Sequence, residues 1–181
     1  MPSSLHLDPT DARPLGRRHA ILLESGDFLA AVLEPGARVE HDPVRAHPGP
    51  RLWTLLAGRA ALVGADGPTP LHLLEPRVTG GDDGDHSLQG PGRILVTTGL
   101  EPGAAPQGLA LALGTRTLRE ELPRGRAFLH VGAGAASIRI TDEEEPFELR
   151  AGESLWLEDL EGGAEAEIRG LDPDTAIALL S

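Results

Sequence analysis

The chain has 181 residues and a formal net charge of −12, and all sixteen of its basic residues are Arg because Lys is absent. An acidic surface repels phosphate groups at long range, and only two Trp and three Phe are present to stack on bases, so nucleic acid is not an expected partner. The absence of Cys excludes disulfides, thiolate nucleophiles and Cys–metal sites. The length suffices for one large domain or for two small domains that share a core.

Glycine and proline interrupt the whole sequence. The 23 Gly and 16 Pro residues divide it into short apolar segments whose length suits strands better than helices. In chain order we expect strands at residues 19–24, 27–33, 37–41, 51–57, 60–63, 71–74, 93–98, 108–113, 115–122, 127–131, 135–140, 147–149, 154–157, 164–168 and 175–180. Residues 115–122 also allow a short helix, although their place in the pattern favours a strand. The pattern predicts an all-β protein.

One long segment occurs twice. Residues 51–63 read RLWTLLAGRAALV and residues 126–138 read RAFLHVGAGAASI. Each copy is an apolar strand, a small-residue turn at Gly58 or Gly134, and a second strand. A repeat of this length indicates two copies of one all-β unit rather than a solenoid of short repeats.

The repeat predicts two antiparallel β-barrels packed into one body. We place an N-terminal extension at residues 1–18, the first barrel at residues 19–105 and the second at residues 106–181. No apolar run is long enough to span a membrane, so we expect no membrane partner. The N-terminus lacks a basic stretch followed by an apolar one, so we expect a cytoplasmic location.

The repeated unit resembles a cupin half-barrel. In the first copy, residues 35–41 (PGARVEH) open a cupin-like motif and residues 53–58 (WTLLAG) close it. The second copy repeats the closing part at residues 128–134 (FLHVGAG) and continues with residues 147–158 (FELRAGESLWLE). The resemblance implies a jelly-roll bicupin.

The order of the pieces is similar to that of the HutD/Ves family of small bicupins, over about residues 27–180. In that family a Pro-Gly step and an Arg lead into the Leu-Leu-x-Gly hairpin, as residues 47–51 (HPGPR) do here. The family's N-terminal Trp…Gly-Gly-x-Thr-x-Glu segment has no counterpart in residues 1–26, and its Asp-x-Asn-x-Met strand falls near residues 93–97, which lack both polar residues. The family's ligand pocket would therefore keep only Arg51.

Arg51 is the most informative polar residue in this pattern. Its planar guanidinium suits a carboxylate, and strand alternation places Trp53 on the same face. The resemblance implies a small carboxylate metabolite as ligand, and the alternative partner of Arg51 is internal, either Glu40 or an Asp of residues 82–85. The candidate ligand-binding residues are Arg51, Trp53, His47 and His86.

A cupin metal site needs two or three imidazoles and a carboxylate that converge. The sequence offers His41, His47 and His86, but Arg51 stands where the Glu ligand belongs and its positive charge would repel a divalent cation. We therefore expect no metal and no other cofactor. His130, on an apolar strand, suits a buried imidazole with one hydrogen bond.

These residues favour a non-catalytic, small-molecule-binding or regulatory protein and leave enzymatic activity open. One alternative is a metal-dependent dioxygenase or isomerase that uses His41, His47 and His86. The other is a degenerate barrel kept for structural contacts. Because cupin barrels often pair through strands, the resemblance also implies that the chain can form a homodimer.

Overall fold

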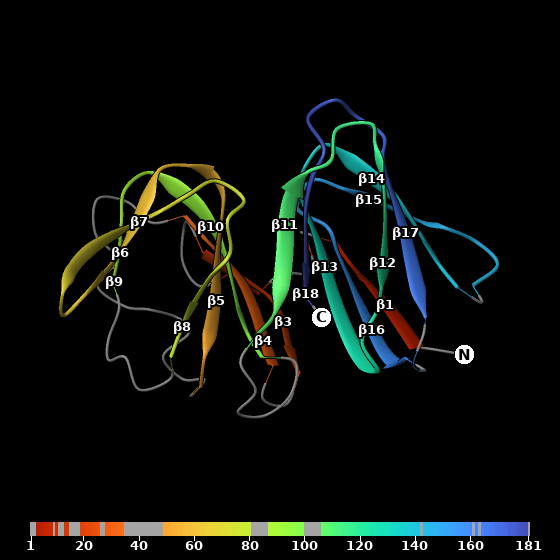
Figure 1. Cartoon of the computed structure of the whole chain (residues 1–181), viewed down its shortest axis with the longest axis horizontal. Helices are drawn as coiled ribbons and strands as arrows, with labels where there is room; N and C mark the ends of the chain where they lie inside the picture. The colour runs from red at the N-terminus through yellow and green to blue at the C-terminus, as the bar shows by residue number, and fades with distance from the viewer. Residues whose placement is uncertain are drawn as a thin grey trace. The chain divides into compact units, whose positions relative to one another are not determined.

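The structure is a computed structural model that describes residues 3–8, 10, 13–14, 19–25, 28–34, 49–80, 87–99, 106–141, 143–160, 162 and 164–180 (Figure 1). Within these ranges every regular element is a β-strand, and the strand pairs whose residue register is known are all antiparallel. The predicted all-β class is confirmed. The described residues accordingly include no helix with the length and hydropathy of a membrane span.

The chain divides into two compact units. The N-terminal unit is Asp11–Gly108, and the C-terminal unit combines Met1–Thr10 with Leu109–Ser181. Each unit contains two sheets.

The C-terminal unit has a five-stranded sheet in the order β1-β16-β13-β18-β11 and a four-stranded sheet in the order β12-β17-β14-β15. Its strands are β1 (Ser3–Leu7), β11 (Gly108–Ala112), β12 (Thr117–Glu121), β13 (Gly125–Ala133), β14 (Ala135–Ile140), β15 (Phe147–Arg150), β16 (Ser154–Leu160), β17 (Glu165–Gly170) and β18 (Ala176–Leu180).

The N-terminal unit has a six-stranded sheet in the order β2-β3-β4-β10-β5-β8 and a three-stranded sheet in the order β7-β6-β9. Its strands are β2 (Arg13–Pro14), β3 (His19–Ser25), β4 (Phe28–Leu33), β5 (Arg51–Gly58), β6 (Ala60–Gly64), β7 (Gly67–Leu71), β8 (Arg77–Thr79), β9 (Ser87–Gln89) and β10 (Gly92–Thr98).

In each unit the two sheets share one apolar core. Leu129 of β13 and Ile177 of β18 belong to the same buried cluster as Ile138 and Ile168 of the four-stranded sheet. The N-terminal unit repeats this arrangement with its own cluster, which includes residues of β4, β5, β6, β7, β9 and β10. Burial of each large aliphatic side chain contributes about 1.5–3 kcal/mol before the entropy cost, so these clusters are the main source of stability.

The strand pairing repeats between the units. β5 turns into β6 at Gly58 (φ 80°) and β13 turns into β14 at Gly134 (φ 67°), a left-handed conformation that favours glycine. β5 pairs with β8 and β10, as β13 pairs with β16 and β18. β6 pairs with β7 and β9, as β14 pairs with β15 and β17. The repeated sequence thus forms the same hairpin in the same pairing context.

The predicted strand at residues 71–74 is wrong, because β7 occupies Gly67–Leu71. Pro68 and Pro70 cannot donate backbone hydrogen bonds, so the sequence gives no strand signal before Leu71. β7 is an edge strand that pairs only with β6, and an edge strand tolerates proline on its open side. The neighbouring segment at 115–122, where we allowed a helix, contains strand β12 as expected. The strand expected at 37–41 lies outside the described residues.

The first eighteen residues, expected as an extension, include a strand of the C-terminal unit. β1 pairs with β16 along its whole length, from Ser3 opposite Glu158 to Leu7 opposite Ser154. In Figure 1, β1 is the red strand beside the blue β16. The chain therefore starts in one unit and continues into the other after residue 10.

Candidate functional site

A layer of polar side chains closes one end of the apolar inner face of the N-terminal unit. Arg51, at the start of β5, lies opposite Thr79 of β8 on one side and Thr98 of β10 on the other. The next inward-facing residue of β5 is Trp53, which belongs to the buried cluster. We call Arg51, Thr79 and Thr98 the polar layer.

Hydrogen bonds fix both threonine hydroxyls of the polar layer. The Trp53 indole N–H donates to Thr79 Oγ1 over 3.0 Å, and the backbone N–H of Leu29 donates to Thr98 Oγ1 over 2.8 Å. Thr79 is 7% exposed and Thr98 is 3% exposed, whereas Arg51 is half-buried. Arg51 also interacts with another group of the chain, and Thr98 makes an interaction besides its hydrogen bond with Leu29. The half-buried Arg51 thus lies in register between two threonines whose hydroxyls both accept hydrogen bonds.

The equivalent layer of the C-terminal unit is apolar. Ala127 of β13 lies opposite Leu157 of β16. This pair is equivalent to Arg51 and Thr79, because Ala127 and Arg51 each stand seven residues before the glycine of their hairpin. Ala127 and Leu157 both belong to the buried core cluster. The polar layer is therefore a property of the N-terminal unit and not of the repeated fold.

Of the residues predicted from the sequence, the structure describes Arg51 and Trp53. Trp53 is fully buried, so it reaches the site through its hydrogen bond to Thr79. The other candidates lie outside the described residues: His41, His47, His86, Glu40 and residues 82–85. Among the residues that are described, no three His, Asp or Glu side chains form a group that could hold a metal ion. The expectation of no metal and the alternative set His41, His47 and His86 both stay untested.

The sequence analysis missed Thr79 and Thr98. Thr98 ends a strand that was predicted, and its spacing from Ile94 and Val96 places it on the inner face. Thr79 lies on β8, which has only three residues and gives no periodic signal. Both hydroxyls become visible only when the register against β5 is known.

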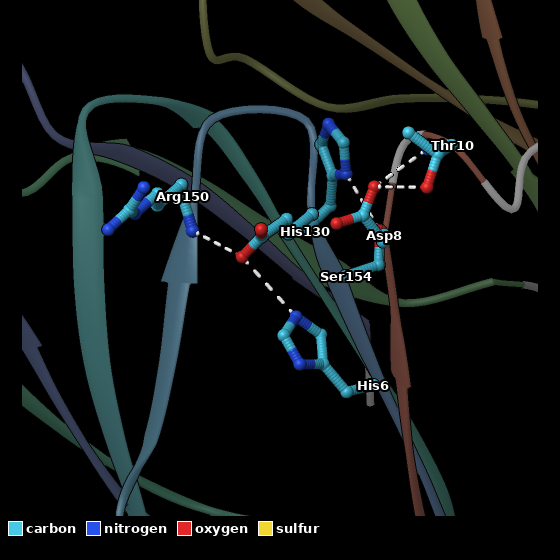
Figure 2. A network of polar contacts seen from close by, with 7 residues as sticks. His6, Asp8, Thr10, His130, Arg150 and Ser154 are labelled. Carbon is cyan, nitrogen blue, oxygen red and sulfur yellow. Dashed lines mark hydrogen bonds and ion pairs between the residues drawn. The ribbon is translucent and has the colours of Figure 1, made fainter.

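His130 is the buried imidazole that the sequence predicts. It is 0% exposed, and its Nδ1 lies 2.9 Å from Oγ of Ser154, the residue opposite it on β16 (Figure 2). The two side chains lie on the face of β13 opposite the core cluster, because Leu129 and Val131 face that cluster. His130 therefore acts as a cross-strand structural group.

A second set of polar contacts holds β1. The His6 Nε2–H donates to Glu153 Oε2 over 3.3 Å, and the same oxygen accepts the backbone N–H of Arg150 over 2.7 Å (Figure 2). After β1, the backbone N–H and the hydroxyl of Thr10 donate to Asp8 Oδ1 over 2.8 and 2.7 Å. These two hydrogen bonds lower the pKa of the Asp8 carboxyl, because they stabilise its charged form.

An open depression of about 360 Å³ lies on the outer face of the four-stranded sheet. Arg119 and Glu167 line it and bind each other, with Arg119 Nη2 and Nε 2.6 and 2.9 Å from Glu167 Oε2. Arg139, Glu143 and Glu165 also line it. Its charges are mixed and exposed, so it does not select one ligand class.

The comparisons with known proteins concern the fold. No protein-family model and no curated protein matches the sequence. A conserved Pseudomonas aeruginosa PAO1 protein of unknown function, PA5104, superposes with a TM-score of 0.79 at 15% identity over 99% of this chain and 98% of its own. HutD from Pseudomonas fluorescens SBW25, solved in a formate condition, gives 0.65 at 12% identity over 99% and 98%. The pirin YhhW from Escherichia coli, in complex with nickel(II), gives 0.63 at 11% identity over 98% of both chains.

These neighbours define the class of fold. The chain is an all-β protein with a cupin-like fold, and its likeness to HutD and to a pirin extends over nearly its full length. At these identities the likeness extends to the fold alone.

Proposed function

We propose that the chain is a non-catalytic bicupin of HutD/Ves type that binds a small carboxylate-bearing molecule at the polar layer of its N-terminal unit. In this proposal Arg51 binds the carboxylate, Thr79 assists, and Trp53 positions Thr79. His47 and His86, which lie outside the described residues, remain candidate ligand contacts.

The single observation that carries the proposal is the contrast between equivalent layers. The repeated fold is stable with Ala127 and Leu157 in this layer, yet the N-terminal unit places Arg51 and Thr79 there. A half-buried guanidinium gives up part of its hydration, and Arg51, which already interacts within the chain, has enough N–H donors to bind an anionic ligand as well. A polar layer in an otherwise apolar face is therefore best explained by binding.

The chemistry of the layer fits a carboxylate. The guanidinium carries five N–H donors in a planar fork, so it can keep its present contact and still donate to a carboxylate. Thr79 Oγ1 accepts the indole N–H of Trp53, which leaves its own O–H for donation to an oxygen of the ligand. The formate condition in which HutD was solved supports a carboxylate as the first probe.

The test is thermal unfolding in sodium formate, acetate or oxalate, against sodium chloride at equal ionic strength. A carboxylate at 100 times its Kd should raise the stability by about 2.7 kcal/mol. For a chain of this size, that corresponds to an increase in Tm of about 5–10 °C.

Three variants give this test its specificity. Arg51→Gln should weaken binding at least about tenfold, because a charge-assisted hydrogen bond is worth about 1.5–3 kcal/mol. Arg51→Lys keeps the charge but loses the planar fork, so it should bind at an intermediate level. Arg59→Gln is the matched control, because Arg59 is exposed and lies beyond the other end of β5. No stabilisation by any carboxylate, or equal stabilisation of Arg51→Gln, would leave Arg51 with a purely internal role.

The metal-dependent alternative has its own test. The nickel(II) complex of the pirin YhhW makes a metal worth measuring directly. Near-stoichiometric nickel, iron, manganese or zinc in the untagged protein, lost on His41→Ala or His86→Ala, would favour the metal-dependent dioxygenase or isomerase over the carboxylate-binding protein. A protein that holds no metal after incubation with each ion would exclude this metal-dependent enzyme.

A further inference from the structure

β1 belongs to the C-terminal unit, although about 100 residues of the N-terminal unit separate it from the other strands of that unit in the sequence. It forms the outer edge of the five-stranded sheet beside β16, whereas the remaining strands of that unit begin at Gly108. Only residues 8–12 separate β1 from β2, which belongs to the other unit. We propose that the outer edge of β16 is a strand-binding site that accepts β1 from a second copy of this chain as well as from its own.

The contacts of β1 are those of a bound peptide more than those of a core strand. Ser4, Leu5 and His6 are exposed, with Leu5 49% exposed. The strand is held by backbone pairing over five residues and by the contact between His6 and Glu153. Main-chain hydrogen bonds of this kind provide affinity wherever an extended segment adds to a sheet edge.

The edge that β1 covers belongs to a deeply buried strand. Leu155, Trp156 and Leu157 of β16 are 0%, 3% and 3% exposed. If β1 left, the backbone N–H and C=O groups along this edge would lose their partners, and an uncovered edge of this kind pairs readily with another strand. The edge therefore favours an occupied state, and an identical β1 from a second copy satisfies it equally well.

The identity of the occupant follows from the register. A second copy offers the same pairs, from Ser3 opposite Glu158 to Leu7 opposite Ser154, and the same His6 donor for Glu153. The chain's own β1 is the stronger competitor because only residues 8–12 connect it to β2, and a short tether gives an effective concentration in about the millimolar range. Exchange between copies should therefore increase with protein concentration.

The absence of Cys makes the proposal directly testable by engineered disulfides. Full-length Ser3→Cys and Glu158→Cys variants are mixed in urea, refolded together at a series of concentrations and oxidised. Peptide mass spectrometry then quantifies the disulfide that joins position 3 of one chain to position 158 of another. We expect this linkage to grow at least several-fold from the lowest to the highest concentration.

The control replaces Glu158→Cys by Glu148→Cys, at an exposed position of β15 in the other sheet of the same unit. It should give at least several-fold less of the linkage to position 3. The double variant Ser3→Cys/Glu158→Cys checks that the engineered pair can form, since it should crosslink within one chain at low concentration. If the double variant crosslinks only within one chain at every concentration, and the mixture gives no more linkage than the control, exchange of β1 does not occur.

Discussion

The two units differ most clearly in one layer of their inner faces. In the C-terminal unit Ala127 and Leu157 complete an apolar core, whereas in the N-terminal unit Arg51 and Thr79 occupy the equivalent pair. The hairpins around this layer are the same in both units, so the fold does not require either choice. The comparison teaches that the repeated fold accepts an apolar layer, so that the polar layer needs a separate explanation, for which we propose ligand binding.

The largest effect is expected when the polar residue is moved to the apolar unit. Ala127→Arg places a guanidinium at a position that is 1% exposed and surrounded by apolar side chains. A buried charge without a partner costs about 3–5 kcal/mol, and urea unfolding measures the loss. Arg51→Ala should cost much less, because Arg51 is only half-buried. If Ala127→Arg and Arg51→Ala lowered the free energy of unfolding by similar amounts, the two units would not differ in how well this layer accommodates a charge.

The next effect tests whether the two hairpins are equivalent. An added Cβ at Gly58 would meet the carbonyl oxygen of Pro91, and one at Gly134 would lie 2.8 Å from the Cα of Thr175. Both glycines also have positive φ, so Gly58→Ala and Gly134→Ala should each lower the free energy of unfolding by about 2–3 kcal/mol. Gly162→Ala is the control, because nothing lies within 4 Å of its added Cβ. If either hairpin variant is as stable as this control, the turns are not equivalent.

A smaller loss of stability is expected when either tryptophan is replaced, and only one of the two replacements should also lower carboxylate affinity. Trp53→Phe keeps an aromatic ring but removes the donor to Thr79, and it should cost about 1–2 kcal/mol in urea unfolding. Because Thr79 loses its anchor, carboxylate affinity should also fall. Trp156→Phe in the C-terminal unit changes a residue that is 3% exposed and should affect stability without affecting carboxylate affinity. Equal loss of affinity in both variants would contradict the assignment of the site to the N-terminal unit.

The smallest effect concerns the turn after β1, a strand that only the C-terminal unit receives. The Thr10 hydrogen bonds lower the pKa of Asp8 in the folded chain, so their stabilisation is present above the unfolded value of about 3.9 and is lost as pH falls through the folded value. Asp8→Asn should therefore unfold at slightly lower urea than the parent at neutral pH and should match it at strongly acidic pH. A gap that widens on acidification would contradict the role of these hydrogen bonds.

The sequence was most predictive where the signal was local. Alternating apolar residues on both sides of Gly58 and Gly134 define the hairpins, and the structure contains both. β7 was missed because proline signals a turn unless the strand is known to be an edge. β1 was missed because its partner, β16, lies near the other end of the chain. A five-residue segment with two apolar residues gives no local sign of such a long-range pairing.

In the candidate site, too, only the residues with a local sequence signal could be predicted. Arg51 could be singled out because residues 47–51 resemble the step that leads into the hairpin in the HutD/Ves family, and strand alternation links it to Trp53. Thr79 and Thr98 could not be recognised, since a threonine in a strand is common and only cross-strand register brings these two beside Arg51. The role of Trp53 as the donor to Thr79 likewise depends on that register.

The most direct test of the carboxylate site observes the two indole N–H groups by ¹H–¹⁵N NMR during titration with sodium formate. The chain has two Trp, with Trp53 in the N-terminal unit and Trp156 in the C-terminal unit, so Trp156→Phe assigns both signals. We predict a saturable shift of the Trp53 signal that is absent in sodium chloride and in Arg51→Gln, with the Trp156 signal unchanged. A Trp53 signal that stays fixed, or that moves equally in Arg51→Gln, would contradict carboxylate binding at the polar layer.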